Sequence, residues 1–488
     1  MNMIKSLILG SAAGIVALGG AQAADLPLKA KAVEYVKVCS LYGAGFYYIP
    51  GTDTCIKLGG YLRADTSFNA GSAYDMPRWA GAPNTRTSND YIARARQDLN
   101  IDTRTATEYG VVRTYFDVTF NWTSGSAVRA GSDDAVFGGS NTGVGVYYAF
   151  IQFAGFTMGK AVSQFSTPWT GYPGNNTSFL IGGQDDVTGI NQLAYTAQFG
   201  NGVSASVSLE DSSGALLNGN TSASFNPLGA YNSYNRSQLY AVVGGVAANN
   251  WGGTSVPDIV GQIRVDQAWG LFQISAAAHE LRAGNAIGGF GHPDDKWGYA
   301  VMGAISLKNL PTGPGDSINF DATYSNGASR YVIGGVNGDN FGIFSNGNAN
   351  AAVGYTSDGV YAPGGDIETT TVWGIRGAFN HNWDPYWSSS LFGSYTSVSY
   401  NNNAKAILQG SNLCSGVGGG FCDPNFTVSQ IGTVLRWTPV KNLTLSAEAM
   451  YSMVDSKNSG QLGVVAGAVR NLSDEGTWTF GVRAQRNF

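Results

Sequence analysis

The chain has 488 residues, 12% of them charged, and a formal net charge of −5. That charged fraction is about half of the average for a soluble protein, and a mildly acidic chain is poorly suited to binding nucleic acid, so no nucleic-acid partner is expected. No apolar run reaches the ~20 residues of a membrane-spanning helix, whereas abundant Gly, Tyr and Phe favour strands, turns and an all-β fold.

The first 23 residues have the pattern of a cleaved export signal. Lys5 precedes an apolar stretch from Leu7 to Leu18, and Ala21-Gln22-Ala23 is a small-residue cleavage site. The stretch is too short for a membrane anchor, which is the alternative. Removal of Lys5 leaves 27 basic and 33 acidic residues, a formal charge of −6. We expect a signal peptide at 1–23 and a periplasmic segment at 24–54.

Sixteen segments in which apolar and polar residues alternate follow from residue 55 to the C-terminus. The predicted strands are 55–69, 89–103, 109–123, 142–153, 155–164, 191–199, 203–210, 256–265, 271–281, 296–308, 316–324, 370–379, 388–400, 426–437, 443–454 and 477–488. Every second connection is short, whereas the others are long, up to 211–255 and 325–369. An additional strand is possible at 237–246.

This alternation of short and long connections distinguishes a transmembrane barrel from a soluble β-sandwich. A barrel has tight periplasmic turns and long extracellular loops. Within the fifteenth segment, Leu443 and Leu445 alternate with Thr444 and Glu448, as expected for one lipid-facing and one water-facing side. We therefore predict a 16-stranded antiparallel transmembrane β-barrel over 55–488, and barrels of this size enclose an aqueous lumen.

Aromatic residues and the chain end agree with this barrel. Tryptophans near strand ends would form interfacial girdles; they are Trp122, Trp269, Trp297, Trp373, Trp383, Trp387, Trp437 and Trp478. The last strand alternates from Trp478 to the terminal Phe488, with Arg486 as the exception in an apolar position. So close to the chain end, that charge costs roughly 0–1 kcal/mol.

Four cysteines in an exported chain fit two disulfides. The predicted topology places Cys55 at the periplasmic start of the first strand but Cys414 and Cys422 in an extracellular loop. We therefore predict the pairs Cys39–Cys55 and Cys414–Cys422. Zinc is disfavoured because no histidine lies near either pair at ligand spacing, so neither a metal nor another cofactor is expected.

Residues 161–186, after the fifth strand, are the candidate for a loop that narrows the lumen. They include Trp169, Tyr172, Phe179 and the pair Asp185-Asp186. Aromatic side chains are better buried than exposed to water, which favours an inward-folded constriction loop. The alternative is an outward loop that packs on a partner subunit.

Arginines with lumen-facing parity are expected opposite that loop: Arg63 on the first strand, Arg94 and Arg96 on the second, and Arg113 on the third. Together with Asp185 and Asp186 they would set a transverse field across the constriction. The alternative is that they pair with acidic residues of their own wall, namely Asp65, Asp98 and Asp117. Arg264, Arg376 and Arg436 have the same parity.

Three stretches resemble the alphaproteobacterial general porins, the rhizobial and Brucella type. They are Glu34-Tyr-Val-Lys-Val-Cys39 continuing to Cys55-Ile-Lys-Leu-Gly-Gly-Tyr61, Ala149-Phe-Ile-Gln-Phe-Ala-Gly-Phe-Thr-Met-Gly-Lys160, and Gly481-Val-Arg-Ala-Gln-Arg-Asn-Phe488. The resemblance implies a homotrimeric diffusion pore in the Gram-negative outer membrane, in contact with lipid and lipopolysaccharide. It also implies that Phe488 is part of the signal for the outer-membrane assembly machinery.

The expected function is therefore a general porin that passes small hydrophilic solutes and ions, with a slight preference for cations. A substrate-specific porin is the alternative, in which Trp169, Tyr172 and Phe179 form a short aromatic path for a sugar or another nutrient. An outer-membrane barrel enzyme is disfavoured because the chain has only three scattered histidines and no G-x-S-x-G nucleophile motif. We expect no enzymatic activity.

Overall fold

The structure is a computed structural model that describes residues 37–71, 77–79, 89–124, 142–169, 171–184, 187–211, 239–243, 246–284, 291–333, 340–345, 349–411, 414, 417–418, 420–465 and 468–488. The expected signal peptide and the first part of the periplasmic segment lie outside these residues.

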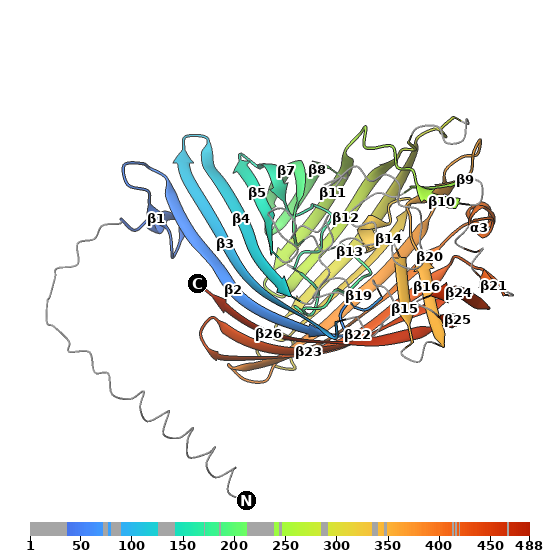
Figure 1. The fold of residues 1–488 in the computed structure, drawn as a ribbon. Helices are drawn as coiled ribbons and strands as arrows, with labels where there is room; N and C mark the ends of the chain where they lie inside the picture. The colour runs from blue at the N-terminus through green and yellow to red at the C-terminus, as the bar shows by residue number, and fades with distance from the viewer. Residues whose placement is uncertain are drawn as a thin grey trace, which may run out of the picture.

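Sixteen antiparallel strands form a closed barrel (Figure 1). They are β2 (Cys55–Phe68), β3 (Tyr91–Thr107), β4 (Gly110–Ser124), β5 (Thr142–Phe153), β6 (Phe156–Ala161), β7 (Ile190–Gly200), β8 (Val203–Glu210), β11 (Asp258–Gln267), β12 (Gly270–Leu281), β13 (Lys296–Lys308), β14 (Ser317–Asn326), β19 (Thr371–Asn382), β20 (Trp387–Ser399), β22 (Phe426–Val440), β23 (Leu443–Ser456) and β26 (Glu475–Asn487). Each pairs with the next, and β26 pairs with β2 to close the ring. The predicted fold class is confirmed.

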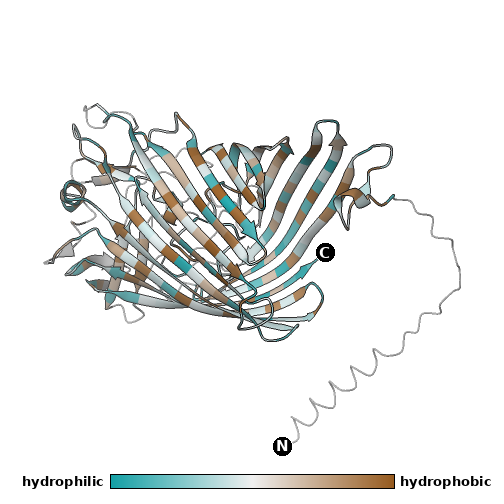
Figure 2. Cartoon of the chain, turned by 180° about the vertical axis from the view of Figure 1, so that it is seen from behind, coloured by the Kyte–Doolittle hydropathy of each residue, from teal (hydrophilic) through white to brown (hydrophobic). Residues whose placement is uncertain are grey.

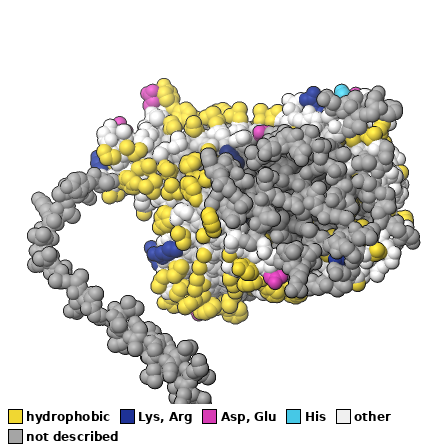
Figure 3. Space-filling model, viewed as in Figure 1, with side chains coloured by type: hydrophobic (Ala, Val, Ile, Leu, Met, Phe, Trp, Pro, Cys, Tyr) yellow, Lys and Arg dark blue, Asp and Glu magenta, His cyan; other side chains and the backbone are white. Residues whose placement is uncertain are grey.

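Hydrophobic and polar residues alternate along each strand because the barrel wall is a single layer, with lipid on its outer face and the lumen on its inner face. Bands of hydrophobic and hydrophilic residues alternate along the barrel strands (Figure 2). On β13, Tyr299 and Val301 are 50% and 45% exposed on the outer face, whereas Ala300 and Met302 are buried on the inner face. Hydrophobic side chains accordingly gather over the outside of the barrel (Figure 3), where a membrane barrel meets lipid.

One end of the barrel carries tight turns, as predicted. The connections β3–β4, β5–β6, β7–β8, β11–β12 and β22–β23 each have two residues. Asn201 and Asn442 adopt positive φ angles of 48° and 66° in two of them, a conformation that asparagine tolerates better than most side chains. Among the described residues, no helix is long and apolar enough to cross a membrane.

The loops at the opposite end form structure that the sequence did not predict. One small sheet joins β9 (Leu239–Val243), β10 (Val246–Asn249), β17 (Gly359–Tyr361) and β18 (Glu368–Thr369), and another joins β15 (Asn340–Phe344), β16 (Asn350–Tyr355), β21 (Val417–Gly418), β24 (Gln461–Val465) and β25 (Ala468–Leu472). Two short helices, α2 (Arg330–Ile333) and α3 (Asn402–Gln409), accompany them. Strand β9 lies within the segment for which an additional strand was considered possible.

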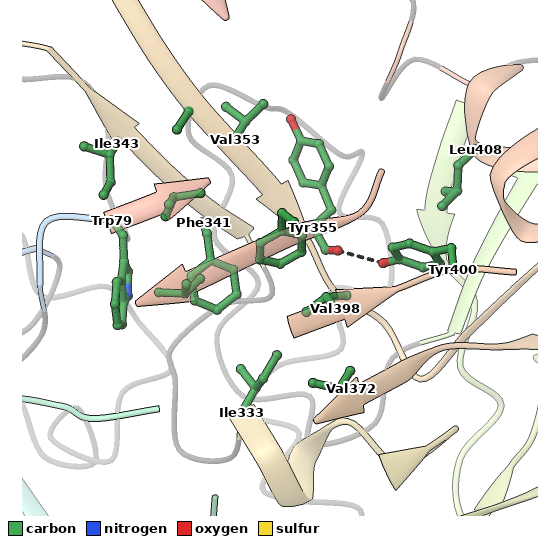
Figure 4. Packing of buried hydrophobic residues seen from close by; sticks show 14 of the residues in the cluster. Trp79, Ile333, Phe341, Ile343, Val353, Tyr355, Val372, Val398, Tyr400 and Leu408 are labelled. Carbon is green, nitrogen blue, oxygen red and sulfur yellow. Dashed lines mark hydrogen bonds between the residues drawn. The ribbon is translucent and has the colours of Figure 1, made fainter. Parts of the chain in front are cut away.

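A hydrophobic core joins these loops to the inner surface of the barrel. Trp79, Phe341, Tyr355 and Tyr400 pack together with side chains from the strand ends, among them Val398 (Figure 4). The Tyr400 hydroxyl donates to the Tyr355 carbonyl at 2.7 Å. The extracellular loops on this side of the barrel are therefore packed onto its wall.

Both predicted disulfides are present, Cys39–Cys55 and Cys414–Cys422. The first joins the segment around η2 (Ser40–Tyr42) and β1 (Tyr47–Tyr48) to the beginning of β2, and β1 adds a short antiparallel pairing to β2. The N-terminal segment is thus attached to the periplasmic end of the first barrel strand.

Candidate functional site

We call the connection between β6 and β7, residues 162–189, the constriction loop; its described residues, 162–169, 171–184 and 187–189, lie inside the barrel. Its first residues are held by β8, because the buried Glu210 carboxylate accepts from the Ser163 hydroxyl at 2.7 Å and from the Gln164 amide at 2.8 Å. The neighbouring strands continue the attachment: the Gln262 and Gln273 side chains donate to the carbonyls of Gln164 and Ser166 at 2.9 and 2.7 Å.

The middle and tip of the loop follow the wall further round. The Asn319 side chain on β14 donates to the Pro173 carbonyl at 2.7 Å, and the Arg436 guanidinium on β22 donates to the Gly174 and Asn175 carbonyls at 2.5 and 2.8 Å. The loop is therefore bonded across the inner surface from β8 to β22, which confirms the predicted inward fold.

Two side chains hold the tip of the loop. The Glu448 carboxylate on β23 accepts from the Thr177 and Ser178 amides at 2.5 and 2.7 Å. The Gln430 amide on β22 accepts from the Ile181 amide at 2.9 Å and donates to the Phe179 carbonyl at 2.7 Å. Because the Glu448 and Gln430 side chains are buried, water competes little for these bonds, and the bonds restrict the loop tip to one position.

The aromatic side chains of the loop pack mainly against the protein. Phe165 and the half-buried Trp169 contact a patch that includes Ala300 and Met302 on the inner face of β13. Phe179 is buried and meets Tyr172 edge to face, with 5.6 Å between the ring centroids. These rings anchor the loop through burial of apolar surface.

The opposite wall carries the predicted arginines. Arg63, Arg94 and Arg96 are 8%, 7% and 6% exposed, and they lie at neighbouring positions because Arg63 pairs with Arg96 and Asp65 pairs with Arg94 in the β2–β3 register. The Arg63 Nε lies 2.9 Å from an Asp65 oxygen, and Arg483 of β26 contacts the other oxygen of that carboxylate. We call Arg63, Arg94, Arg96 and Arg483 the arginine wall.

Arg94 and Arg96 also bond to neutral groups of the same wall. Arg94 donates to the Thr123 hydroxyl at 3.0 Å. Arg96 donates to the Asn121 side chain at 2.5 Å and to the Tyr147 hydroxyl at 2.7 Å. Neutral acceptors orient a guanidinium without cancelling its charge, and Asp98 and Asp117 of the same wall interact electrostatically with Arg96.

Arg113 does not lie with the other three arginines. Its cross-strand partner on β3 is Arg104, eight residues beyond Arg96, which corresponds to about 27 Å along the strand. There Arg113 lies 3.0 Å from the Asp102 carboxylate and donates to the Gln152 side chain at 2.9 Å. Arg113 therefore belongs to the periplasmic end of the lumen.

Asp185 and Asp186, the other predicted constriction residues, lie outside the described residues. Sequence reasoning did not identify the attachment residues Glu210, Gln430 and Glu448. Their lumen-facing parity was a usable signal, but many positions share it. No group of three or more His, Cys, Asp or Glu within the described ranges could hold a metal ion.

Comparison with known proteins agrees with this geometry. A family model described as porin subfamily matches residues 25–480. The chain belongs to this porin subfamily. Porin Omp2a of Brucella melitensis biotype 1 is 36% identical over 281 residues, covering 54% of this chain and 68% of the relative. Porin Omp2b of Brucella abortus is 34% identical over 271 residues, covering 54% and 67%.

A solved structure supports the fold. The outer membrane channel DcaP of Acinetobacter baumannii superimposes with a TM-score of 0.59 at 16% identity, covering 90% of this chain and 99% of DcaP. The family model and the Brucella relatives confirm the expected alphaproteobacterial porin family. The chain is a general porin of the Gram-negative outer membrane, and its family identity implies a channel rather than an enzyme.

Proposed function

We propose that small hydrophilic solutes and ions diffuse passively through the space between the arginine wall and the constriction loop. The observation that carries this proposal is the attachment of the loop to β8, β11, β12, β14, β22 and β23, none of which carries an arginine of the arginine wall. A loop bonded to one side of a wide lumen narrows it while leaving a passage along the other side.

We propose further that Arg63, Arg94 and Arg96 set a transverse field with Asp185 and Asp186. The two aspartates are the only charged residues of the loop sequence between 162 and 189. Arginine side chains on one side and carboxylates on the other orient polar solutes and select ions by sign. Arg113 contributes at the periplasmic exit instead.

The alternative of a substrate-specific porin would need an aromatic path along the lumen. The packing of Trp169, Tyr172 and Phe179 against the barrel and the loop cores favours the general pore. Assembly as a homotrimer, cleavage of residues 1–23 and recognition of Phe488 by the assembly machinery belong to the same proposal. The exposed Phe488 ring beside the β2–β26 closure supports the last of these, since the Phe488 amide donates to the Gly60 carbonyl at 3.1 Å.

Planar bilayer recordings of the purified protein test this function. We expect large ohmic currents that appear in groups of three equal steps and are not blocked by sugars. Saturable block by one solute would support the substrate-specific alternative, and a barrel without conductance would contradict both. Reversal potentials in a salt gradient give the ion preference, which is expected to be slightly cationic.

A further inference from the structure

A group of ionisable side chains is buried where the extracellular ends of β11 and β12 meet the loop that follows β14. His279 of β12, Asp258 of β11, Asp358 ahead of β17 and Arg330 of α2 are 1%, 0%, 2% and 6% exposed. Burial of charges is costly unless they are paired, so this cluster restricts how the loop can sit on the barrel.

His279 lies between two carboxylates. Its Nδ1 is 2.7 Å from an Asp258 oxygen, and its Nε2 is 3.7 Å from an Asp358 oxygen. A neutral imidazole would turn one lone pair toward a carboxylate, whereas the protonated ring presents an N–H to each. The geometry therefore favours the imidazolium form, which joins a barrel strand to the extracellular loop.

Both aspartates also fix helix α2. Asp258 accepts from the Tyr331 hydroxyl at 2.6 Å and lies 3.4 Å from the Arg330 guanidinium. Asp358 accepts from the amide and the hydroxyl of Ser329 at 2.6 and 2.7 Å. Charge-assisted bonds of this kind are stronger than bonds between neutral groups, so the position of α2 depends on the charge state of the cluster.

Helix α2 in turn contacts the constriction loop at its entry and at its exit. The Tyr331 ring packs on Phe165 with 4.4 Å between centroids, and the Val332 carbonyl accepts from the Gly182 amide at 3.0 Å. The Thr167 amide donates to the Gln184 carbonyl at 3.0 Å and ties these two parts of the loop together. A displacement of α2 would therefore remove support from both ends of the loop.

We propose that protonated His279 is a positioning residue for the constriction loop, acting through Asp258, Asp358 and α2, and that its deprotonation at alkaline pH loosens the loop and makes the pore close intermittently. This inference rests on the proposed narrowing by that loop. The charged groups that interact with His279 in the described chain are Asp258, Asp358 and Arg330. Tyr331 bonds to Asp258, and Glu210 of β8 interacts with Arg330.

The test is to record single channels and measure the fraction of time that they spend closed as the pH is raised from about 6 to about 10. We expect the wild-type channel to be quiet at the acidic end and to gain about a tenfold higher closed-state population at the alkaline end, a change that corresponds to about 1.4 kcal/mol. His279→Gln should close frequently at every pH, without a step. A wild-type profile that is flat over the whole range overturns the proposal.

Two variants separate a titrating residue from a merely structural one. His292→Gln is the matched control, because His292 is exposed and bonds only to the adjacent Pro293 carbonyl among the contacts described; it should keep the wild-type step. Asp358→Asn retains an acceptor for Ser329 but removes one carboxylate from His279, so the step should move to lower pH. A step that persists in His279→Gln, or that does not move in Asp358→Asn, contradicts the proposal.

The loop-tip variants Glu448→Ala and Gln430→Ala distinguish a failure of the inference about His279 from a failure of the proposed function. If loosening the tip leaves the current unchanged, the loop does not limit the pore and both ideas fail. If loosening the tip changes the current while the pH step is absent, only the inference about His279 is wrong.

Discussion

The two sides of this barrel use lumen-facing arginines differently. On β19 and β22, Arg376 lies 3.1 Å from Asp321 with both side chains fully buried, and Arg436 donates to carbonyls of the constriction loop. On β3, Arg94 and Arg96 bond to a hydroxyl and an amide of the neighbouring strand. The same side chain thus secures a loop on one wall and, in the proposed function, supplies a field on the other.

The wall that carries the constriction loop is also packed against the extracellular loops. Its strand ends share a hydrophobic core with the extracellular loops, including Phe179 from the constriction loop. On the arginine wall, in contrast, Arg63, Arg94 and Arg96 are buried charged side chains. In the proposed function, the side chains that fill one half of the lumen therefore define the passage along the other half. The predictions below address each half in order of expected effect on the current.

The largest effect is expected from release of the loop tip. Glu448→Ala leaves two amides, those of the half-buried Thr177 and the buried Ser178, without their charged acceptor, and each such bond contributes about 1.5–3 kcal/mol. We expect noisy single-channel currents and, in a liposome-swelling assay, faster uptake of larger sugars. Both effects should be larger when Glu448→Ala is combined with Gln430→Ala. Glu475→Ala, at the extracellular end of β26, is the control. Unchanged currents in the double variant would show that the loop does not limit the pore.

A smaller effect is expected from the arginine wall. Arg94→Ser and Arg96→Ser each remove one charge from the passage, and at an effective dielectric constant between those of the protein and water this changes a local ion energy by about 1 kcal/mol. Reversal potentials should shift toward cations by about fivefold in permeability ratio. Arg113→Ser is the matched control on the same wall, where Asp102 already pairs the charge. An equal shift of the reversal potential in Arg113→Ser would contradict the proposal that the field is set at Arg94 and Arg96 rather than at the periplasmic end of the lumen.

Removal of the first disulfide should affect stability but not the current. Cys39→Ser with Cys55→Ser frees a segment of sequence separation 16 from the start of β2. Loop-closure entropy for this length is worth about 3 kcal/mol. We expect a lower thermal unfolding midpoint in detergent, followed by circular dichroism, and wild-type conductance at room temperature. A changed conductance would indicate that this segment reaches the arginine wall.

The smallest effect concerns the periplasmic turn before β14, on the wall that carries the loop. Hydrogen bonds from the Thr312 hydroxyl, the Asn382 amide and the His381 ring lower the pKa of Asp316 to about 2. A depressed pKa stabilises the fold above the usual value of about 4 and loses that contribution as the pH falls toward 2. Asp316→Asn should therefore remove part of the fall in unfolding midpoint between about pH 4 and pH 2, without changing the current. An identical pH profile in the variant would contradict this.

The barrel and its two disulfides could be read from the sequence because both depend on local patterns. A strand such as β13 shows its two faces within thirteen residues, and the alternation of short and long connections assigns Cys55 and Cys414 to opposite ends of the barrel. Lumen-facing parity likewise located Arg63, Arg94 and Arg96. The alternation along a strand shows whether a side chain faces the lumen or the lipid, but not how far along the pore it lies. For this reason the sequence predicted Arg113 at the constriction together with the other three arginines.

What the tertiary structure alone decided involves residues far apart in the chain. Strand β9 pairs in parallel with β17, and His279 meets Asp358 from another loop. Such contacts leave no periodic signal, because any of many loop segments could supply the partner. The sequence determined the barrel because lipid-facing and water-facing side chains alternate along each strand, which is a repeating local pattern. The packing of the loops, in contrast, depended on charges and apolar side chains that only folding brings together.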